Sequence, residues 1–346
     1  MNFKYNRYSF ILIAYLFLVA ACSKDSGELI NKGPDTSQTE NWMQDLIAKY
    51  PDQEFTLKDI CMPRAHDAGT YVLNNCTAGN ACNTLTQDQS MGTMLKMGIR
   101  VFDVRPSLIQ GEYWTYHRTG CGGLGCEGVE LRTFLEETAD YLNTHNELVI
   151  FQVKNMCNTG SQDIGLLALF QEVLGAQIFA LSSPLNDYFI RTPLKDLIPL
   201  YNNTGKVVLL FEDLSSANEQ AQLGIFSNDF IPTSGSYANN PDIDIVIADQ
   251  KQKFQSFNPI ANRLFQLSYT FTLNIGMAAS CLSLEDAVSI EDIALEARGR
   301  MSSTFDQWMA EGVMTPNNIP NILSVDFCNT SVTLECIRLS EYSLEP

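Results

Sequence analysis

The stretch Gly98-Ile-Arg-Val-Phe-Asp-Val-Arg-Pro106 carries the first indication of the fold. Its apolar centre, residues 100–104, is typical of a short buried strand, and Arg105 follows directly where that strand ends. Runs of the same kind recur along the chain, at residues 148–153, 207–211, 243–248, 265–271 and 322–325. The sequence therefore predicts a series of short strands.

Helical patterns lie between several of these runs. Apolar faces recur at helical spacing within residues 131–142 and 164–173, and residues 283–300 indicate a third helix. Strands that alternate with helices favour a parallel sheet. The chain beyond residue 40 shows no internal repeat and no linker, and its length of roughly 300 residues is ordinary for one α/β barrel. We therefore expect residues 41–346 to form a single α/β domain, a TIM-type barrel.

Charged side chains follow five of the predicted strands at the point where each strand ends. In a barrel of parallel strands these ends meet at one face, and active sites are built on that face. Charged residues often stand at strand ends only because water solvates them there. Their recurrence after five strands is therefore stronger evidence for a site than any single residue. The five are Arg105, Lys154, Glu212, Asp249 and Asp326.

The chain holds three histidines, and two of them stand in segments suited to phosphodiester cleavage. His66 lies in a P-R-A-H-D segment, and His117 lies in a T-Y-H-R segment. Splitting a phosphodiester near neutral pH requires a group that takes a proton, a group that gives one, and a cation for the phosphoryl oxygens. Histidine suits both proton transfers. Asp67, Asp103 and Arg105 stand between the two histidines and supply the cation and carboxylates.

The first 21 residues have the pattern of a signal peptide. Lys4 and Arg7 precede an apolar run, residues 10–21, that is too short to span a bilayer. The run ends in V-A-A-C at Cys22, which resembles a bacterial lipobox. We therefore expect a lipoprotein signal peptide, a lipidated Cys22 and a flexible tether over residues 22–40. The protein would then be a lipid-anchored membrane lipoprotein of the bacterial cell envelope, on the periplasmic face or the cell surface. An ordinary cleaved signal with a chance cysteine remains the alternative.

The net charge disfavours nucleic-acid binding. The chain has 22 Lys and Arg against 40 Asp and Glu, a net charge of −18. Loss of the first 21 residues would remove two positive charges and no negative ones, which leaves −20. No basic stripe offsets this charge, so we expect no nucleic-acid partner. Anionic lipid would also repel the chain, and a lipid anchor would hold it at a membrane all the same.

Nine cysteines follow Cys22. In an exported chain they predict disulfides. An odd number leaves at least one thiol free or paired with another chain. A zinc site is disfavoured because no pair has C-x-x-C spacing and histidines are scarce. Short spacing suggests the pairs Cys76–Cys82, Cys121–Cys126 and Cys328–Cys336, although connectivity cannot be read from a sequence.

The motifs together resemble the X domain of phosphatidylinositol-specific phospholipase C in its bacterial, metal-independent form. The resemblance covers most of residues 55–330 and is strong over residues 61–154 and 321–327. The P-x-x-H-D segment, the G-I-R-x-F-D-x-R segment and the later histidine carry it, in that order. Members of this family have a distorted, partly open TIM barrel, which agrees with the strands predicted above.

The resemblance implies a role for each residue of the histidine constellation. His66 would be the general base that deprotonates the inositol 2-hydroxyl, and Asp326 would orient it. The hydroxyl would attack phosphorus within the same molecule and form inositol 1,2-cyclic phosphate. His117, partnered by Asp67, would be the general acid that protonates the departing diacylglycerol oxygen. Arg105 would bind the non-bridging phosphate oxygens.

The resemblance also implies substrate-binding residues. Asp103 matches an acidic position that we expect to orient neighbouring groups, and Lys154 and Asp249 match positions that hold the inositol ring. Glu212 stands where bacterial members place an arginine that contacts inositol, and a carboxylate there could still bond a hydroxyl. Calcium-dependent relatives carry a carboxylate at the position of Arg105, so the resemblance implies no metal and no other cofactor.

Three alternatives stay open beside a phosphatidylinositol phospholipase C. A metal-dependent glycerophosphodiester phosphodiesterase has a similar barrel and paired histidines, but it needs glutamates near the first histidine, where residues 61–71 offer only Asp67. A catalytically inactive headgroup-binding lipoprotein would fit the acidic Glu212. A nutrient-capture lipoprotein would leave the histidines unexplained. The insert over residues 121–126 is either a disulfide-pinned loop at the rim of the site or a surface clip, and we expect His145 to be structural.

Overall fold

The computed structural model describes residues 36–182, 185–198, 204–214, 218–283 and 286–345, all within one structural unit. The predicted signal peptide, Cys22 and the tether up to residue 35 lie outside the described residues. Residues 36–40, which the sequence places in the tether, pack onto the domain. Thr39 is buried, and the carbonyl oxygen of Glu40 accepts a hydrogen bond from Arg100 Nη2 at 2.7 Å. The packed domain therefore begins before residue 40.

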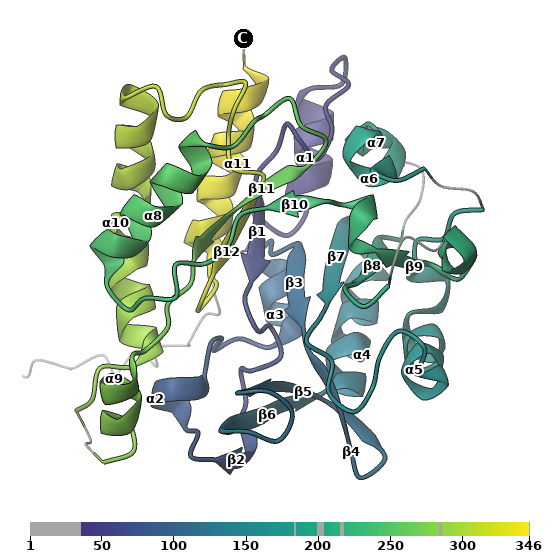
Figure 1. Ribbon diagram of the computed structural model, residues 1–346. Helices are drawn as coiled ribbons and strands as arrows, with labels where there is room; N and C mark the ends of the chain where they lie inside the picture. The colour runs from purple at the N-terminus through teal and green to yellow at the C-terminus, as the bar shows by residue number, and fades with distance from the viewer. Residues whose placement is uncertain (1–35, 183–184, 199–203, 215–217, 284–285, 346) are drawn as a thin grey trace, which may run out of the picture. The chain divides into compact units, whose positions relative to one another are not determined.

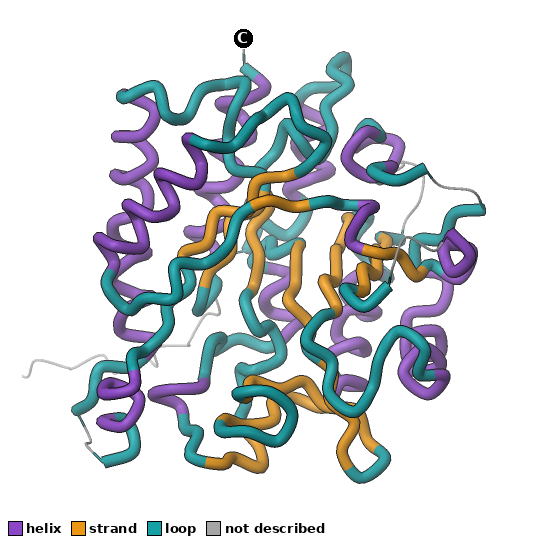
Figure 2. Tube along the Cα trace, in the orientation of Figure 1, coloured by secondary structure: helices purple, strands orange, loops and turns teal. Residues whose placement is uncertain are grey.

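A curled sheet of eight parallel strands forms the centre of the domain (Figures 1 and 2). The two outermost strands of this order are not hydrogen-bonded to each other, so the barrel is open along one seam among the described strands. This is the distorted α/β barrel that the sequence predicts. In spatial order the strands are β10 (Thr233–Ser234), β11 (Leu264–Tyr269), β12 (Ile322–Val325), β1 (Met62–Ala65), β3 (Val101–Val104), β7 (Leu148–Val153), β8 (Lys206–Phe211) and β9 (Ile225–Ser227).

Helices cover the outer face of the sheet (Figure 2). Phe102 of β3 and Phe151 of β7 pack edge to face at 6.0 Å, and Phe134 of α4 packs on both. Burying one such side chain contributes about 1.5–3 kcal/mol. The longer helices are α1 (Trp42–Lys49), α3 (Met91–Lys96), α4 (Leu131–Leu142), α5 (Ile164–Leu174), α8 (Ile243–Gln255), α10 (Ile290–Ala310) and α11 (Thr330–Leu344), and α6 (Tyr188–Arg191) and α7 (Leu194–Leu197) are single turns.

A second, antiparallel sheet lies at the carboxyl ends of the barrel strands (Figure 1). Two short helices lie on the same side, and we call this sheet and these helices the cap. The sequence did not predict these strands. The cap consists of β2 (Asn74–Thr77), β6 (Gly125–Glu130), β5 (Glu112–Arg118) and β4 (Pro106–Ile109), with α2 (Ala81–Thr84) and α9 (Ile275–Ser280).

The strand prediction for residues 243–248 is wrong, because this segment begins helix α8. The carboxylate of Asp242 caps the helix by accepting hydrogen bonds from two backbone N–H groups. Ile243, Val246 and Phe254 are buried at helical spacing, a period that the short alternating run concealed. The third predicted helix also begins later than expected, at Ile290.

The short-spaced cysteine pairs are wrong. The disulfides join Cys76 to Cys126, Cys82 to Cys281 and Cys121 to Cys157, with Cα–Cα distances of 4.1, 5.6 and 5.4 Å. Two of these bonds cross 50 and 199 residues, because the cap brings together segments that are distant in the sequence. The free, buried thiols among the described residues are Cys61, Cys328 and Cys336.

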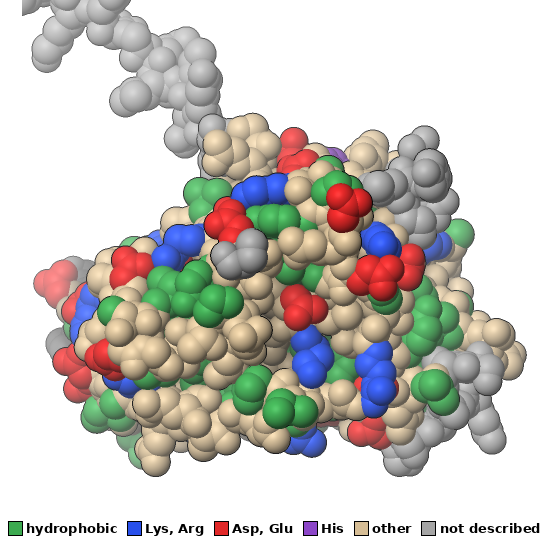
Figure 3. All heavy atoms as spheres, turned by 90° about the horizontal axis from the view of Figure 1, so that it is seen from above, with side chains coloured by type: hydrophobic (Ala, Val, Ile, Leu, Met, Phe, Trp, Pro, Cys, Tyr) green, Lys and Arg blue, Asp and Glu red, His purple; other side chains and the backbone are tan. Residues whose placement is uncertain are grey.

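The surface drawn in Figure 3 carries both acidic and basic side chains. On the face viewed from above, acidic and basic side chains are interspersed (Figure 3). Within the described part of the chain, no helix combines the length and apolarity needed to cross a bilayer.

Candidate active site

The barrel interior changes from apolar to charged along the strands. Because successive side chains alternate between faces, every second residue of a strand points inward. At the amino-terminal level the inward residues are apolar, as in Met62, Ile150 and Ile322. The next inward residue of each strand is polar. The one after it belongs to the candidate catalytic residues. Counted along each strand, the second inward residues are Arg64, Asp103, Gln152 and Ser324, and the third are His66, Arg105, Lys154 and Asp326.

His66 is held by a carboxylate behind it. Its Nδ1 lies 2.8 Å from Oδ1 of Asp326, whose other oxygen accepts the backbone N–H of Phe271 at 3.0 Å. A carboxylate only accepts, so Nδ1 carries the proton of the neutral ring and Nε2 keeps a lone pair. The imidazole is 21% exposed, whereas Asp326 is fully buried. His66 is thus arranged as a base that a buried acid orients, the logic of a catalytic dyad.

His117 comes from the cap rather than from the barrel. It lies on β5, and its Nδ1 donates to the carbonyl oxygen of Thr84 at 2.8 Å. This bond leaves Nε2 free to face the cavity, 3.5 Å from Oδ2 of Asp67. The two imidazole rings lie 6.5 Å apart, so a small group can enter between them.

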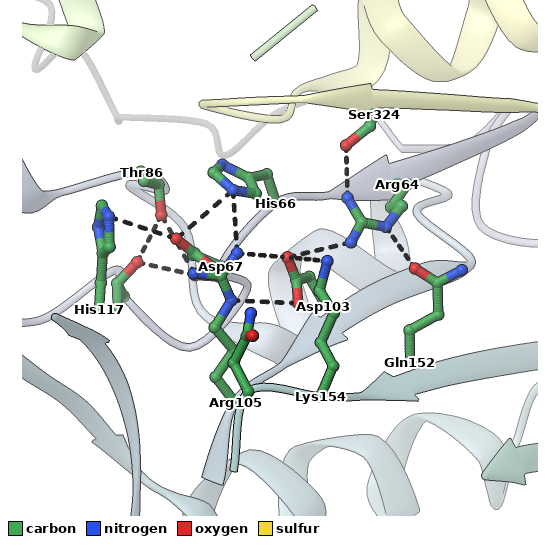
Figure 4. Close-up of polar contacts among 12 residues, drawn as sticks. Arg64, His66, Asp67, Thr86, Asp103, Arg105, His117, Gln152, Lys154 and Ser324 are labelled. Atoms are coloured by element: carbon green, nitrogen blue, oxygen red, sulfur yellow. Dashed lines mark hydrogen bonds and ion pairs between the residues drawn. The ribbon is translucent and has the colours of Figure 1, made fainter. Parts of the chain in front are cut away.

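Asp67 stands between the two histidines and the arginine (Figure 4). Its Oδ2 lies 3.5 Å from Nε2 of His66, and its Oδ1 lies 2.5 Å from Nε of Arg105. Asp67 has a positive φ of 43°, as do Asn155 and Phe327 with 46° and 51°, and each follows the end of a barrel strand. Such conformations cost about 1–3 kcal/mol each and cluster at functional sites.

Asp103 is the fully buried anion beneath these groups. Lys154 Nζ lies 3.2 Å away, Arg105 Nη2 3.1 Å and Arg64 Nη2 3.0 Å. Burial alone would raise the pKa of Asp103, but Arg105, Lys154 and Arg64 together hold its pKa well below the usual range. Burial lowers the pKa of Lys154 against the opposing effect of Asp103.

Arg64 is a site residue that the sequence analysis missed. It is buried on β1, where its Nε donates to Gln152 at 2.7 Å and its Nη1 donates to Ser324 at 2.6 Å. The guanidinium thereby spans three strands and fixes the position of Asp103. Its spacing of two residues from His66 on a strand was the available signal, because this places both side chains on the same face.

These side chains line a cavity of about 460 Å³. The structure places His66, Asp67, Arg105, His117 and Lys154 in its wall, with Asp103 and Asp326 directly behind them. The sequence analysis also missed the wall that comes from the segment after β10, from β11 and from the residue that follows β11. That wall contributes Tyr237, Asn239, Gln266, Ser268 and Thr270.

Two predicted substrate-binding residues do not line this cavity. Asp249 lies on α8 and pairs with Lys253 Nζ at 2.7 Å, because the predicted strand before it is a helix. The carboxylate of Glu212 accepts the backbone N–H of Asn155, next to Lys154, and so acts on the loop that borders the cavity. His145 stacks on Tyr141 at 4.2 Å, a packing contact.

The donor set fits a metal ion poorly. His66, Asp67 and Asp103 offer ligand atoms within 4.8 Å of one another. Arg105 pairs with both carboxylates, and Asp103 has two further cations beside it. Protein cations thus already offset the charge of both carboxylates, which weakens the attraction of this group for a divalent ion.

No family model matches the chain, but individual proteins are similar to it. The 1-phosphatidylinositol phosphodiesterase of Staphylococcus aureus (strain Newman) is 25% identical over 188 residues, which cover 54% of this chain and 54% of that protein. The same protein of strain NCTC 8325 matches at 25% identity, over 54% of this chain and 51% of that protein. The chain thus matches about half the length of these curated relatives.

Solved structures match over more of the chain. The phosphatidylinositol-specific phospholipase C of Listeria monocytogenes superposes with a TM-score of 0.56 at 18% identity, covering 87% of this chain and 98% of that one. A Staphylococcus aureus phosphatidylinositol-specific phospholipase C superposes with a TM-score of 0.57 at 17% identity, covering 88% and 98%. The chain therefore has the fold of the bacterial phosphatidylinositol-specific phospholipases C.

Proposed function

We propose that this protein is a phospholipase C that cleaves phosphatidylinositol or a related inositol phospholipid. The observation that carries the proposal is the pair of oriented imidazoles, His66 and His117, on either side of Asp67 and Arg105 in one cavity. The curated relatives are named for cleavage of the same lipid.

The proposed reaction needs one base and one acid. Nε2 of neutral His66 takes the proton of the inositol 2-hydroxyl, whose oxygen attacks phosphorus within the same molecule. The bond between phosphorus and the glycerol oxygen breaks, and that oxygen takes the Nε2 proton of protonated His117. The products are diacylglycerol and inositol 1,2-cyclic phosphate. Asp326 stabilises the imidazolium that forms on His66.

Arg105 stabilises the negative charge on the phosphoryl oxygens in this proposal. Its guanidinium is 16% exposed and held by Asp67 and Asp103, so it faces the cavity already oriented. A fixed cation in a water-poor site stabilises developing charge without reorganisation. Arg105 takes the place of a metal in this mechanism, so we propose that the enzyme needs no divalent ion.

The remaining cavity wall suits a polyhydroxylated ring. Lys154, Asn155 and Gln266 offer donors, and Asn239 and Ser268 add groups that both donate and accept. We propose that Lys154 contacts the inositol hydroxyls and that Glu212 acts indirectly, by holding Asn155. A direct role for Asp249 stays a prediction from the family resemblance.

The proposed location is the bacterial cell envelope. Acyl chains on Cys22 would keep the domain near its substrate despite its negative charge. Metabolic labelling with radioactive palmitate tests this, with Cys22→Ser as the control. Label on the unchanged protein and none on the variant is the expected result, and an unlabelled protein would contradict it.

The function is tested by ³¹P NMR of phosphatidylinositol micelles incubated with the protein in excess EDTA. A cyclic inositol phosphate resonance is expected, and His66→Ala should lower its rate of formation by about 10²–10⁴-fold. Activity that returns only with Ca²⁺ or Mg²⁺ would favour the metal-dependent glycerophosphodiesterase. No product under either condition would favour a headgroup-binding protein.

A further inference from the structure

A second cavity adjoins the catalytic one. It is a groove of about 430 Å³ on the cap, between α9 and the loop that joins β5 to β6. Asn83, His117, Leu273 and Ala278 belong to the walls of both cavities, so the groove is continuous with the catalytic cavity at His117. Apart from these shared residues, the groove is lined chiefly by Ala78, Leu124, Ile275, Ala279 and Leu282.

The groove is apolar and open to solvent. Ile275 is 90% exposed, Leu124 57% and Leu282 53%. Among the described residues that line the groove, Arg118 is the one with a permanent charge, and Glu127 neutralises it at 2.7 Å. Three large apolar side chains around one hollow are costly to leave in water, so their arrangement indicates an apolar ligand.

The position of the groove identifies the part of the substrate that faces it. The catalytic cavity has Lys154 and Gln266 in its wall, and the groove does not. His117 lines both cavities, and in the proposed function it protonates the oxygen of the leaving group. A leaving group bonded to that oxygen therefore lies next to the groove and can extend into it. In an inositol phospholipid it is a diacylglycerol, whose glycerol is followed by apolar chains.

Covalent bonds rather than burial hold the walls of the groove. Helix α9 has six residues, and none of them is buried. The Cys82–Cys281 disulfide ties its carboxyl end to α2. The Cys121–Cys157 and Cys76–Cys126 disulfides hold the opposite loop, which carries Leu124, at its two ends. Three disulfides thus stabilise a surface that a hydrophobic core does not support.

We propose that this groove is an acyl subsite: it binds the first methylenes of the lipid's acyl chains while the phosphate lies between His66 and His117. The inference rests on the proposed function. It adds that the leaving group must carry acyl chains for full activity. Each methylene that enters the groove raises kcat/KM by up to about fourfold, because burial of a CH₂ group is worth that much in affinity. The disulfides keep the subsite open.

The test compares two inositol substrates with one variant and one matched control. The variant carries Ile275→Ser and Leu282→Ser, and the control carries Ile260→Ser, an 85% exposed isoleucine that does not line the groove. The substrates are monomeric dihexanoyl-phosphatidylinositol below its micelle concentration and glycerophosphoinositol, which has no acyl chains.

The groove variant should lose about tenfold or more in kcat/KM on the dihexanoyl lipid and keep its rate on glycerophosphoinositol within about twofold. The control should match the unchanged protein on both. Equal loss on both substrates, or no loss on either, overturns the acyl subsite. A loss seen only on vesicles, with no effect on the monomeric lipid, also overturns it and indicates a membrane-contact surface. If the unchanged protein cleaves neither substrate, the proposed function itself has failed.

A second variant tests the disulfide requirement. Cys82→Ser with Cys281→Ser should lower kcat/KM more on the dihexanoyl lipid than on glycerophosphoinositol, with circular dichroism confirming that the barrel is folded. Retention of the full preference for the acylated substrate would contradict the role of this disulfide. If that variant fails to fold, reduction of the folded protein with dithiothreitol, monitored on both substrates, gives the same comparison.

Discussion

The barrel and the exposed parts of the cap are stabilised by different means, although the active site needs both regions. Strands β1, β3 and β12 are buried along their whole length, whereas all four residues of β2 are exposed and α9 buries none. The disulfides all have at least one cysteine in the cap or in its β5–β6 loop, while the free thiols Cys61, Cys328 and Cys336 lie buried on or beside barrel elements. Hydrophobic burial stabilises the barrel and also β6, whose Val129 joins the barrel core, whereas the exposed parts of the cap depend on covalent links.

The proposed base and the proposed acid lie on different sides of this division, the base on the barrel and the acid on the cap. The proposed base His66, its carboxylate Asp326 and the cation Arg105 stand on the barrel. The acid His117 stands on the crosslinked part, with Thr84 of α2 fixing its ring. The two halves of the proton transfer therefore depend on different stabilising forces and can be separated by experiment.

The largest effect is expected at the two histidines. His66→Ala and His117→Ala should each lower kcat on phosphatidylinositol by about 10²–10⁴-fold, because each removes one proton-transfer step. The double variant should be little slower than the worse single variant, since the two act as a unit. Steady-state kinetics in EDTA measures all three, and full additivity would show that the two rings do not serve one reaction.

The next largest effect separates the stabilities of the two regions. Phe102→Ala should lower the free energy of unfolding by about 3–5 kcal/mol, because it leaves a cavity between β3, β7 and α4. Leu124→Ser in the cap should change it by less than about 0.5 kcal/mol, as an exposed substitution does. Urea unfolding followed by fluorescence measures both, and similar losses would show that Leu124 is as important to the core as Phe102.

An acid-dependent effect is expected at Asp103. Its pKa in the folded protein lies well below that of an unfolded aspartate, so the unfolded chain binds the extra proton first as pH falls. The stability that Asp103 contributes is therefore present above about pH 4 and is lost progressively below it. Asp103→Asn should make the protein less stable at neutral pH and flatten this acid loss. Urea midpoints between pH 3 and 7 measure it, and an unchanged slope would contradict the assignment.

The smallest effect is expected at the third histidine. His145→Gln should leave kcat unchanged within about twofold, because this ring packs on Tyr141 and does not line the cavity. The same assay as for His66 measures it. A loss comparable to that of His66→Ala would show that the cavity is not the site of turnover.

Much of the barrel could be predicted from short segments. Residues 148–153 and 322–325 were predicted as strands and form β7 and β12 with the same bounds, because their apolar residues are local signals. The same local rule failed at residues 243–248, where a helical period is hidden within an alternating run. Arg64 was missed because its importance lies in partners on β7 and β12.

The residue types around the proposed chemistry could be read from the chain, since His66, Asp67, Arg105 and His117 stand in compact motifs. Their geometry depended on contacts far apart in the sequence. The bond from His66 to Asp326 crosses 260 residues, and the Cys82–Cys281 disulfide crosses 199. Strand periodicity and motif composition are local properties and could be predicted from the sequence. Strand order, disulfide pairing and the meeting of cap and barrel at His117 were decided by tertiary packing, because no local interaction distinguishes one distant partner from another.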